Sequence, residues 1–173
     1  LKSFMNKTLK RKNIFSPRVS THRFSYALVF LLSIAALGAA WYLQNVKDLA
    51  PCPLCIMQRF GFWALALFSL VGLIQGTLSK PMNAIAAFTG CCAVGIAAYH
   101  NWKLMQPNFQ CGIDPVQNFV NDLPTAHWWP DMFMATGMCG AKLPLVLGVG
   151  IPQWSLLGLL GLTLVFVWRC VRA

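Results

Sequence analysis

The sequence predicts an all-α membrane protein: a four-helix transmembrane bundle with a short amphipathic surface helix in the second outer loop. Of its 173 residues, 57% are apolar and 10% are charged, whereas soluble domains carry roughly 25% charged residues. Four apolar stretches approach the ~20 residues that a helix needs to cross a bilayer, and they cover 26–43, 56–74, 84–99 and 151–168. Together they leave no room for a sizeable soluble core.

The first apolar stretch follows a basic segment, residues 1–25, that contains seven lysines and arginines and no acid. Small residues end the stretch, as in a signal peptide, but its apolar length exceeds the ~7 to 15 residues of a signal-peptide core. We therefore expect an uncleaved first span within a four-span membrane domain at 26–170. The basic segment has no apolar periodicity, so it predicts a disordered cytoplasmic tail that touches anionic lipid rather than nucleic acid.

The distribution of charge predicts the topology. Ten of the fourteen lysines and arginines lie before the first stretch, between the second and third, or after the fourth. All four acids lie in the other two connections. Because positive charge marks the cytoplasmic side of a membrane protein, both termini are expected inside and both remaining loops outside. Disulfides persist on the outer face.

A CxxC motif, formed by Cys52 and Cys55, lies at the beginning of the second apolar stretch. Proline is tolerated in the first turn of a helix, so Pro53 allows Cys55 to lie in the first turn of this span. The positive end of the helix and Arg59, four residues after Cys55, both favour the reactive thiolate. A charge inside a span indicates function by default, although an arginine near a helix end also serves as an interfacial anchor. The motif predicts a redox-active pair of thiols.

Zinc binding is the other chemistry that a CxxC motif indicates, because a structural zinc site needs about four ligands. Cys111, Cys139, His100 and His127 are available on the same face, but they lack the close spacing of the second half of a zinc site. We therefore expect no metal. His100, at the outer end of the third span, is a candidate to line a site for a small polar headgroup, or it is an interfacial histidine without a ligand.

The second outer loop, 100–150, is the one long polar connection of the chain. An apolar pattern of i, i+3, i+4, i+7 spacing predicts the short amphipathic helix, and its members are Val116, Phe119, Val120 and Leu123. Trp128 and Trp129 follow, and tryptophan favours the membrane interface. We expect this loop to lie partly on the bilayer, with a small self-packed ectodomain as the alternative.

Cys111 and Cys139 lie in this second loop and are separated by 27 residues. Taken alone, they are explained equally well by a structural disulfide that closes a loop. Beside a CxxC motif on the same face, they predict a second dithiol from which thiol-disulfide exchange relays electrons. Cys91 and Cys92 fall inside the third span, where cysteine behaves as a small apolar residue.

With these residues assembled, the chain resembles the disulfide bond formation protein B (DsbB) family, the bacterial inner-membrane thiol oxidases that depend on quinone. The resemblance covers roughly residues 26–169. The matching elements, in chain order, are Cys52-Pro-Leu-Cys55 with Gln58-Arg59, Tyr99-His100, Cys111, Ala135-Thr-Gly-Met-Cys139 and Ile151-Pro-Gln-Trp154. In this combination and order the motifs are specific.

The resemblance implies that the chain reoxidises a soluble periplasmic thiol oxidase of the DsbA type and delivers the electrons to ubiquinone or menaquinone. It also implies a place in the bacterial inner membrane, with both redox loops in the periplasm. Carried over by motif, Cys111 would form the mixed disulfide with the partner. Cys139 would be its resolving mate and would then exchange with Cys52.

The same resemblance implies a quinone site at the head of the second span. Cys55 would be the thiolate that faces the quinone ring, with Arg59 near a quinone carbonyl and His100 nearby.

Two alternatives stay open. One is a vitamin K epoxide reductase-like protein, which two outer dithiols fit less well. The other is a non-catalytic membrane protein, such as a transporter subunit or an assembly factor, whose outer disulfides only hold loops together. Cycling of Cys52 and Cys55 between dithiol and disulfide would distinguish an enzyme from this second alternative.

Overall fold

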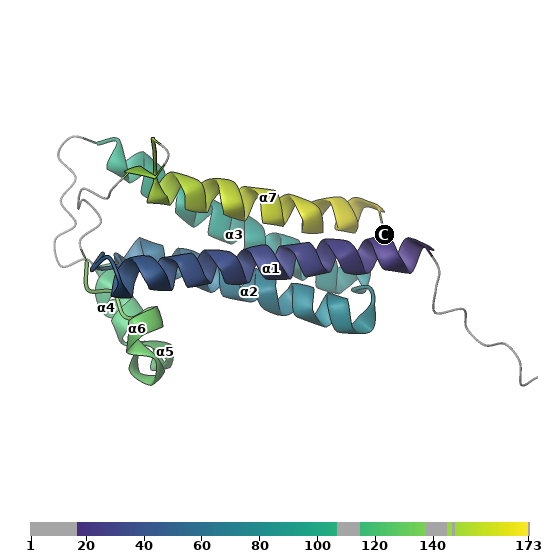
Figure 1. Ribbon diagram of the computed structural model, residues 1–173, viewed down its shortest axis with the longest axis horizontal. Coiled ribbons are helices and arrows are strands. Elements are labelled where there is room, and N and C mark those ends of the chain that lie inside the picture. Colours follow the sequence, from purple (N-terminus) through teal and green to yellow (C-terminus); the bar gives the residue numbers. More distant parts are fainter. Residues whose placement is uncertain (1–16, 107–114, 138–144, 147, 173) are drawn as a thin grey trace, which may run out of the picture.

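The computed structural model describes residues 17–106, 115–137, 145–146 and 148–172. Within them, four long helices form an elongated bundle, and short helices gather at one end of it (Figure 1). The long helices are α1 (Pro17–Asn45), α2 (Pro53–Gln75), α3 (Lys80–Leu104) and α7 (Ile151–Arg172). All four are long and apolar enough to cross a membrane. The predicted all-α, four-helix membrane fold is therefore confirmed.

The helices are longer than the apolar stretches from which they were predicted. α1 begins at Pro17, inside the segment expected as a tail, and α3 continues to Leu104, past the predicted end at residue 99. An apolar stretch reports only the length that lipid surrounds, whereas a helix continues wherever its backbone hydrogen bonds continue. Each of the four long helices thus contains one of the predicted spans.

The bundle is built by a chain of helix pairs: α1 packs on α2, α2 on α3, and α3 on α7. Small residues allow this close packing, as is common between membrane helices. A Cβ atom added to Gly61 of α2 would lie 2.5 Å from Cβ of Ala93 on α3. One added to Gly90 of α3 would lie 2.5 Å from Oγ1 of Thr163 on α7. By contrast, α1 and α7 make few contacts with each other.

Three short helices follow α3: α4 (Pro115–Asn121), α5 (Pro124–Trp128) and α6 (Pro130–Phe133). Each begins with a proline, which fits a first helical turn. The predicted amphipathic helix is thus present as α4, and its Val116 and Val120 pack near Ile56 of α2. Phe119 was expected on the same face but is 61% exposed, so the buried face of α4 is narrower than the sequence pattern indicated.

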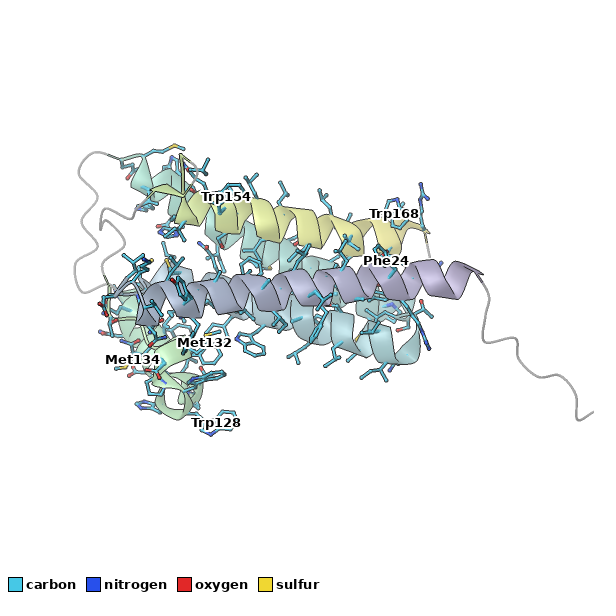
Figure 2. The ribbon with its side chains drawn as sticks, in the orientation of Figure 1. Phe24, Trp128, Met132, Met134, Trp154 and Trp168 are labelled. Carbon is cyan, nitrogen blue, oxygen red and sulfur yellow. The ribbon has the colours of Figure 1, made fainter. Side chains whose placement is uncertain are left out.

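The end of the bundle that carries α4 to α6 also carries a short hairpin. Its strands are β1 (Leu145–Val146) and β2 (Val149–Gly150), paired antiparallel, and they lead directly into α7. This hairpin was not predicted, because two-residue strands leave no periodic signal. Figure 2 shows Trp128 at the tip of the short-helix lobe, pointing away from the long helices, where its side chain is 90% exposed.

Candidate redox site

The CxxC motif forms the beginning of α2. Cys52 is the N-cap residue, and its Sγ accepts a hydrogen bond from the backbone N–H of Cys55 at 3.3 Å. Cys55 therefore lies in the first helical turn, as predicted. The two Sγ atoms are 2.8 Å apart, so closing a disulfide bond of about 2.05 Å requires a movement of less than about 1 Å. This geometry suits a pair that cycles between dithiol and disulfide.

Arg59 turns its guanidinium into the protein rather than out to the interface. The side chain is only 6% exposed. Its Nη1 donates to Oε1 of Gln44 at 2.8 Å and to the carbonyl of Met132 at 2.9 Å, and its Nη2 donates to the carbonyl of Ala40 at 3.4 Å. These bonds offset the cost of burying a charge. The alternative of an anchor that reaches out to lipid phosphate is therefore wrong.

The charge of Arg59 also acts on the CxxC motif. Its guanidinium interacts electrostatically with the thiols of both Cys55 and Cys52. A fixed positive charge beside a sulfur favours its thiolate form, and burial strengthens the interaction because water is excluded. The structure thus brings together the cysteine pair and the arginine that the sequence pattern linked.

His100 lies against the CxxC motif from the outer part of α3. Its side chain has 0% exposure, so the ring faces the interior of the bundle. Nε2 is 3.7 Å from Sγ of Cys52, and Nδ1 is 3.0 Å from Nε2 of Gln58. Gln58 was noted only as part of a motif. A glutamine inside an apolar span, three residues after Cys55, was the signal that could have identified it as a site residue.

A metal is the other occupant to test, because the ligand atoms of Cys52, Cys55 and His100 lie within 4.8 Å of one another. In a tetrahedral zinc site with Zn–S bonds of about 2.3 Å, two sulfurs are about 3.8 Å apart. Here they are 2.8 Å apart. Within the part of the chain that the structure describes, no fourth acid, cysteine or histidine joins the group. The geometry fits sulfur–sulfur chemistry better than zinc.

A cavity of ≈ 690 Å³ extends from the cysteine pair between α1, α2 and α7. Its polar lining is concentrated at one end, where Cys52, Cys55, Gln58 and Arg59 contribute. The rest of the lining is mostly apolar and includes Leu28, Leu32, Leu37, Phe62, Trp154, Leu157 and Leu162. Several of these side chains are about half exposed, and they lie along the line where α1 and α7 make few contacts. The cavity therefore opens sideways, toward the region that lipid would occupy.

The segment 135–137 is fixed beside the cysteine pair. The backbone N–H groups of Thr136 and Gly137 both donate to the carbonyl of Pro51, at 3.1 and 3.0 Å. Asn121 of α4 holds the same segment by bonds to the N–H and the carbonyl of Ala135. A Cβ atom on Gly137 would lie 2.2 Å from the carbonyl oxygen of Ala50, so only glycine fits here.

Of the five remaining cysteines, Cys170 lies half-buried near the end of α7, and the other four form two groups. Cys111 and Cys139, the predicted second dithiol, lie outside the described residues. Cys91 and Cys92 are exposed on α3, and neither lines the cavity. Their position agrees with the prediction that they act as small apolar residues.

Comparison with known proteins gives the family. The model of the family described as Disulfide bond formation protein DsbB matches residues 22–169. A relative from Ralstonia nicotianae is 40% identical over 147 residues, which cover 85% of this chain and 92% of the relative. One from Cupriavidus metallidurans is 42% identical over 147 residues, which cover 85% and 91%. Both are named Disulfide bond formation protein B. With its four membrane-crossing helices, the chain belongs to the DsbB family of membrane proteins that act in disulfide bond formation, an oxidoreductase activity.

Proposed function

We propose that this protein reoxidises a periplasmic thiol oxidase of the DsbA type and passes the electrons to ubiquinone or menaquinone in the membrane. The observation that carries the proposal is the position of Cys52 and Cys55, at the polar end of an apolar cavity that opens toward lipid. Membership in the DsbB family supports disulfide chemistry at this pair. It also makes a vitamin K epoxide reductase-like protein the poorer description.

The cavity suits a quinone in size and chemistry. Small-molecule sites usually occupy about 300–1,000 Å³ and combine an apolar lining with a few polar groups, and this cavity of ≈ 690 Å³ has that character. Arg59 provides N–H donors for a quinone carbonyl, and Cys55 provides the sulfur on the same helix. When bound, a quinone supplies a two-electron, two-proton acceptor. The sideways opening gives a lipid-dissolved molecule a path into the site.

The electron path runs through successive thiol–disulfide exchanges. In each attack a thiolate meets one sulfur of a disulfide, one S–S bond forms and one breaks, and the released sulfur leaves as a thiolate. We assign the first thiol of the partner to attack Cys111, which releases Cys139 to attack Cys52 and frees Cys55. The second thiol of the partner then displaces Cys111 and completes the partner's disulfide, and Cys111 attacks Cys139, which restores their disulfide and frees Cys52. The thiols of Cys52 and Cys55 then lose two electrons and two protons as their disulfide re-forms.

Chain length supports the second exchange. Cys139 follows Gly137 by two residues, and two residues of extended chain span at most about 7 Å. Gly137 is itself hydrogen-bonded to Pro51, the residue before Cys52. The described chain therefore comes within two residues of Cys139 in the sequence at a point beside Cys52.

The charge distribution supports an inner-membrane orientation with both termini in the cytoplasm. The redox pair and the short helices α4 to α6 lie at one end of the bundle, and the C-terminus lies at the other (Figure 1). The end of the bundle that holds the C-terminus also carries four basic residues: Arg23, Lys80, Arg169 and Arg172. The positive-inside rule assigns that end to the cytoplasm and the redox end to the periplasm.

The test is anaerobic oxidation of a reduced DsbA-type protein by the purified chain in detergent, with added ubiquinone, followed by the absorbance of the quinone. We expect one quinone reduced for each partner dithiol oxidised. Cys55→Ser is expected to abolish the reaction. Cys91→Ser is the matched control, since Cys91 lies outside the cavity, and it is expected to keep full activity. A folded chain with intact thiols that reduces neither ubiquinone nor a menaquinone analogue would instead support purely structural disulfides.

A further inference from the structure

His100 connects two side chains at the head of α2. Its ring is fully buried, at 0% exposure. Nε2 lies 3.7 Å from Sγ of Cys52, within the range of a hydrogen bond to sulfur, and Nδ1 lies 3.0 Å from Nε2 of Gln58. Gln58 is 3% exposed. Both ring nitrogens are therefore engaged, each with a buried partner.

The contact with Gln58 determines where the proton of the imidazole resides. The amide –NH₂ of glutamine is only a donor, so Nδ1 of His100 must be the acceptor. An imidazolium has protons on both nitrogens and would present a donor to this donor. A neutral imidazole has one donor and one acceptor, and with Nδ1 accepting, the proton is on Nε2. That proton points to the sulfur of Cys52.

We propose that Gln58 is a positioning residue: its amide holds His100 in the tautomer protonated at Nε2, and that N–H donates a hydrogen bond that stabilises the Cys52 thiolate. The inference rests on the proposed function, because it assumes that Cys52 exchanges disulfides. Gln58 itself does not touch the sulfur, and it acts through the ring between them.

His100 differs from the other groups beside the Cys52 sulfur, which include Sγ of Cys55 at 2.8 Å. The backbone N–H of Cys55 also donates to the sulfur at 3.3 Å, and Arg59 interacts with it electrostatically. Both are fixed parts of α2. The His100 ring comes from a different helix and is able to present either a donor or an acceptor, depending on its tautomer. Hydrogen bonds to a charged sulfur are stronger than those to a neutral one, so a fixed donor favours the thiolate over the thiol.

In the reaction, the tautomer lets Cys52 attack or leave as a thiolate without proton transfer to the ring. When the Cys52–Cys55 disulfide re-forms, the two thiols lose two electrons and two protons to the quinone. His100 keeps its own proton throughout. If Nε2 were the acceptor instead, the ring would act as a base that competes for the thiol proton.

The direct test is nitrogen NMR of the full chain in detergent with labelled histidine, which distinguishes protonated from unprotonated ring nitrogens. His22→Gln and His127→Gln identify the signals of the other two histidines. In the reduced protein we expect His100 to be protonated at Nε2 and unprotonated at Nδ1. Gln58→Glu replaces the donor with a group that only accepts when ionised, and it is expected to move a proton to Nδ1. A protonated Nδ1 in the unsubstituted chain would overturn the proposal.

A second test measures the sulfur itself in a full-length chain whose only cysteine is Cys52, by the ultraviolet absorbance of the thiolate against pH. Removing one hydrogen bond to a charged group corresponds to a shift of about one pH unit. We expect Gln58→Met to raise the titration midpoint by about that amount. Asn101→Leu is the matched control: it removes a different buried amide, which belongs to α3 and is bonded to the carbonyls of Ala97 and Pro152, and it is expected to leave the midpoint unchanged.

The two tests separate this inference from the proposed function. An unchanged midpoint in Gln58→Met, in a chain that still reduces quinone, would contradict the role of Gln58 and leave the oxidase function standing. Equal shifts in Gln58→Met and Asn101→Leu would also contradict it, because they would report general loosening of α3. Loss of quinone reduction in the unsubstituted chain would instead count against the oxidase function.

Discussion

Arg59 is an intramembrane charge with two sets of neighbours. On one side it bonds to Gln44, Met132 and Ala40, which belong to the end of α1 and to α6. On the other side it lines the cavity beside Cys55. A buried arginine is stable only when its donors are satisfied, so the bonds that hold Arg59 also hold the helices around the site. Its effect on binding must therefore be separated from its effect on packing.

Substitution of Arg59 and of its partner Gln44 separates the two effects. Arg59→Met is expected to raise the quinone concentration for half-maximal rate more than 10-fold, and to lower stability by about 1–3 kcal/mol through unsatisfied acceptors. Gln44→Leu removes only the partner at the end of α1, and Gln44 does not line the cavity. We expect it to lower thermal stability without weakening quinone use. Equal weakening by both variants would show that Arg59 acts only by holding α1.

At the site, the sequence predicted how residues close together in the chain are placed, and it missed the contacts between residues far apart in the chain. Cys55 in the first turn and Arg59 four residues later follow from proline chemistry and helical spacing alone. The contact between His100 and Cys52 joins residues 48 positions apart, and that between Arg59 and Met132 joins residues 73 positions apart. Such contacts depend on how the helices pack, which a single sequence does not specify.

Among the elements, segment 135–137 has the most direct connection to the cysteine pair. Pro51 precedes Cys52 and accepts the two backbone hydrogen bonds from Thr136 and Gly137. Asn121 of α4 clamps the segment from the other side. This arrangement fixes Gly137, two residues before Cys139 in the sequence, so its integrity is expected to control exchange between the two dithiols.

Gly137→Ala is expected to disturb that exchange specifically. The new Cβ would lie 2.2 Å from the backbone oxygen of Ala50, so the segment must move away from Pro51. We expect oxidation of the partner protein to slow at least 10-fold, whereas quinone reduction driven by dithiothreitol acting on Cys52 and Cys55 stays normal. Gly95→Ala is the control, because nothing lies within 4 Å of a Cβ there. Equal slowing with both reductants would place the defect at the quinone site instead.

At the level of elements, the sequence predicted the long helices and only part of the second loop. Lipid demands about 20 apolar residues per span, which makes the four spans visible in the sequence. α4 followed from its apolar spacing, but Phe119 is 61% exposed. A helix that lies on a bilayer contacts lipid on one face and protein on the other, so its apolar residues need not all face the protein. α5, α6 and the hairpin are too short to leave a pattern.

In the whole molecule, three pairs of long helices pack closely, α1 with α2, α2 with α3, and α3 with α7, whereas α1 and α7 make few contacts with each other. The contacts of Gly61 with Ala93 and of Gly90 with Thr163 bring α2, α3 and α7 together. The cavity extends between α1 and α7, where the packing is least close. Close packing on one side thus provides a rigid frame, and the open side provides access from the lipid.

Gly90→Ala tests the close packing. Its Cβ would lie 2.5 Å from Oγ1 and 2.8 Å from Cγ2 of Thr163, a buried side chain with little freedom to rotate. Overpacking of this kind is expected to destabilise the bundle by about 1–3 kcal/mol, measured by thermal unfolding in detergent. Thr163→Ala removes both clashing atoms, so the double variant should recover most of the loss. Additive losses would contradict direct contact between the two positions.

The orientation of the whole molecule is tested with two exposed positions at opposite ends of the bundle. In cells with a permeabilised outer membrane, an impermeant maleimide is expected to label Asp131→Cys, in α6, and to leave Ser79→Cys, just before α3, unlabelled. After lysis both should react, which controls for accessibility. Labelling of Ser79→Cys alone, with the inner membrane intact, would show that the topology is the reverse, with the redox pair in the cytoplasm.

Cys52 and Cys55 are expected to transfer their electrons directly to a quinone. The most direct measurement is a single turnover without any partner protein: the reduced Cys111→Ser, Cys139→Ser double variant is mixed anaerobically with one equivalent of ubiquinone. Quinone absorbance and the disulfide state of the tryptic peptides are then followed together. We expect one quinone to be reduced and one Cys52–Cys55 disulfide to form per chain. Thiols that stay reduced beside unreacted quinone would contradict this expectation.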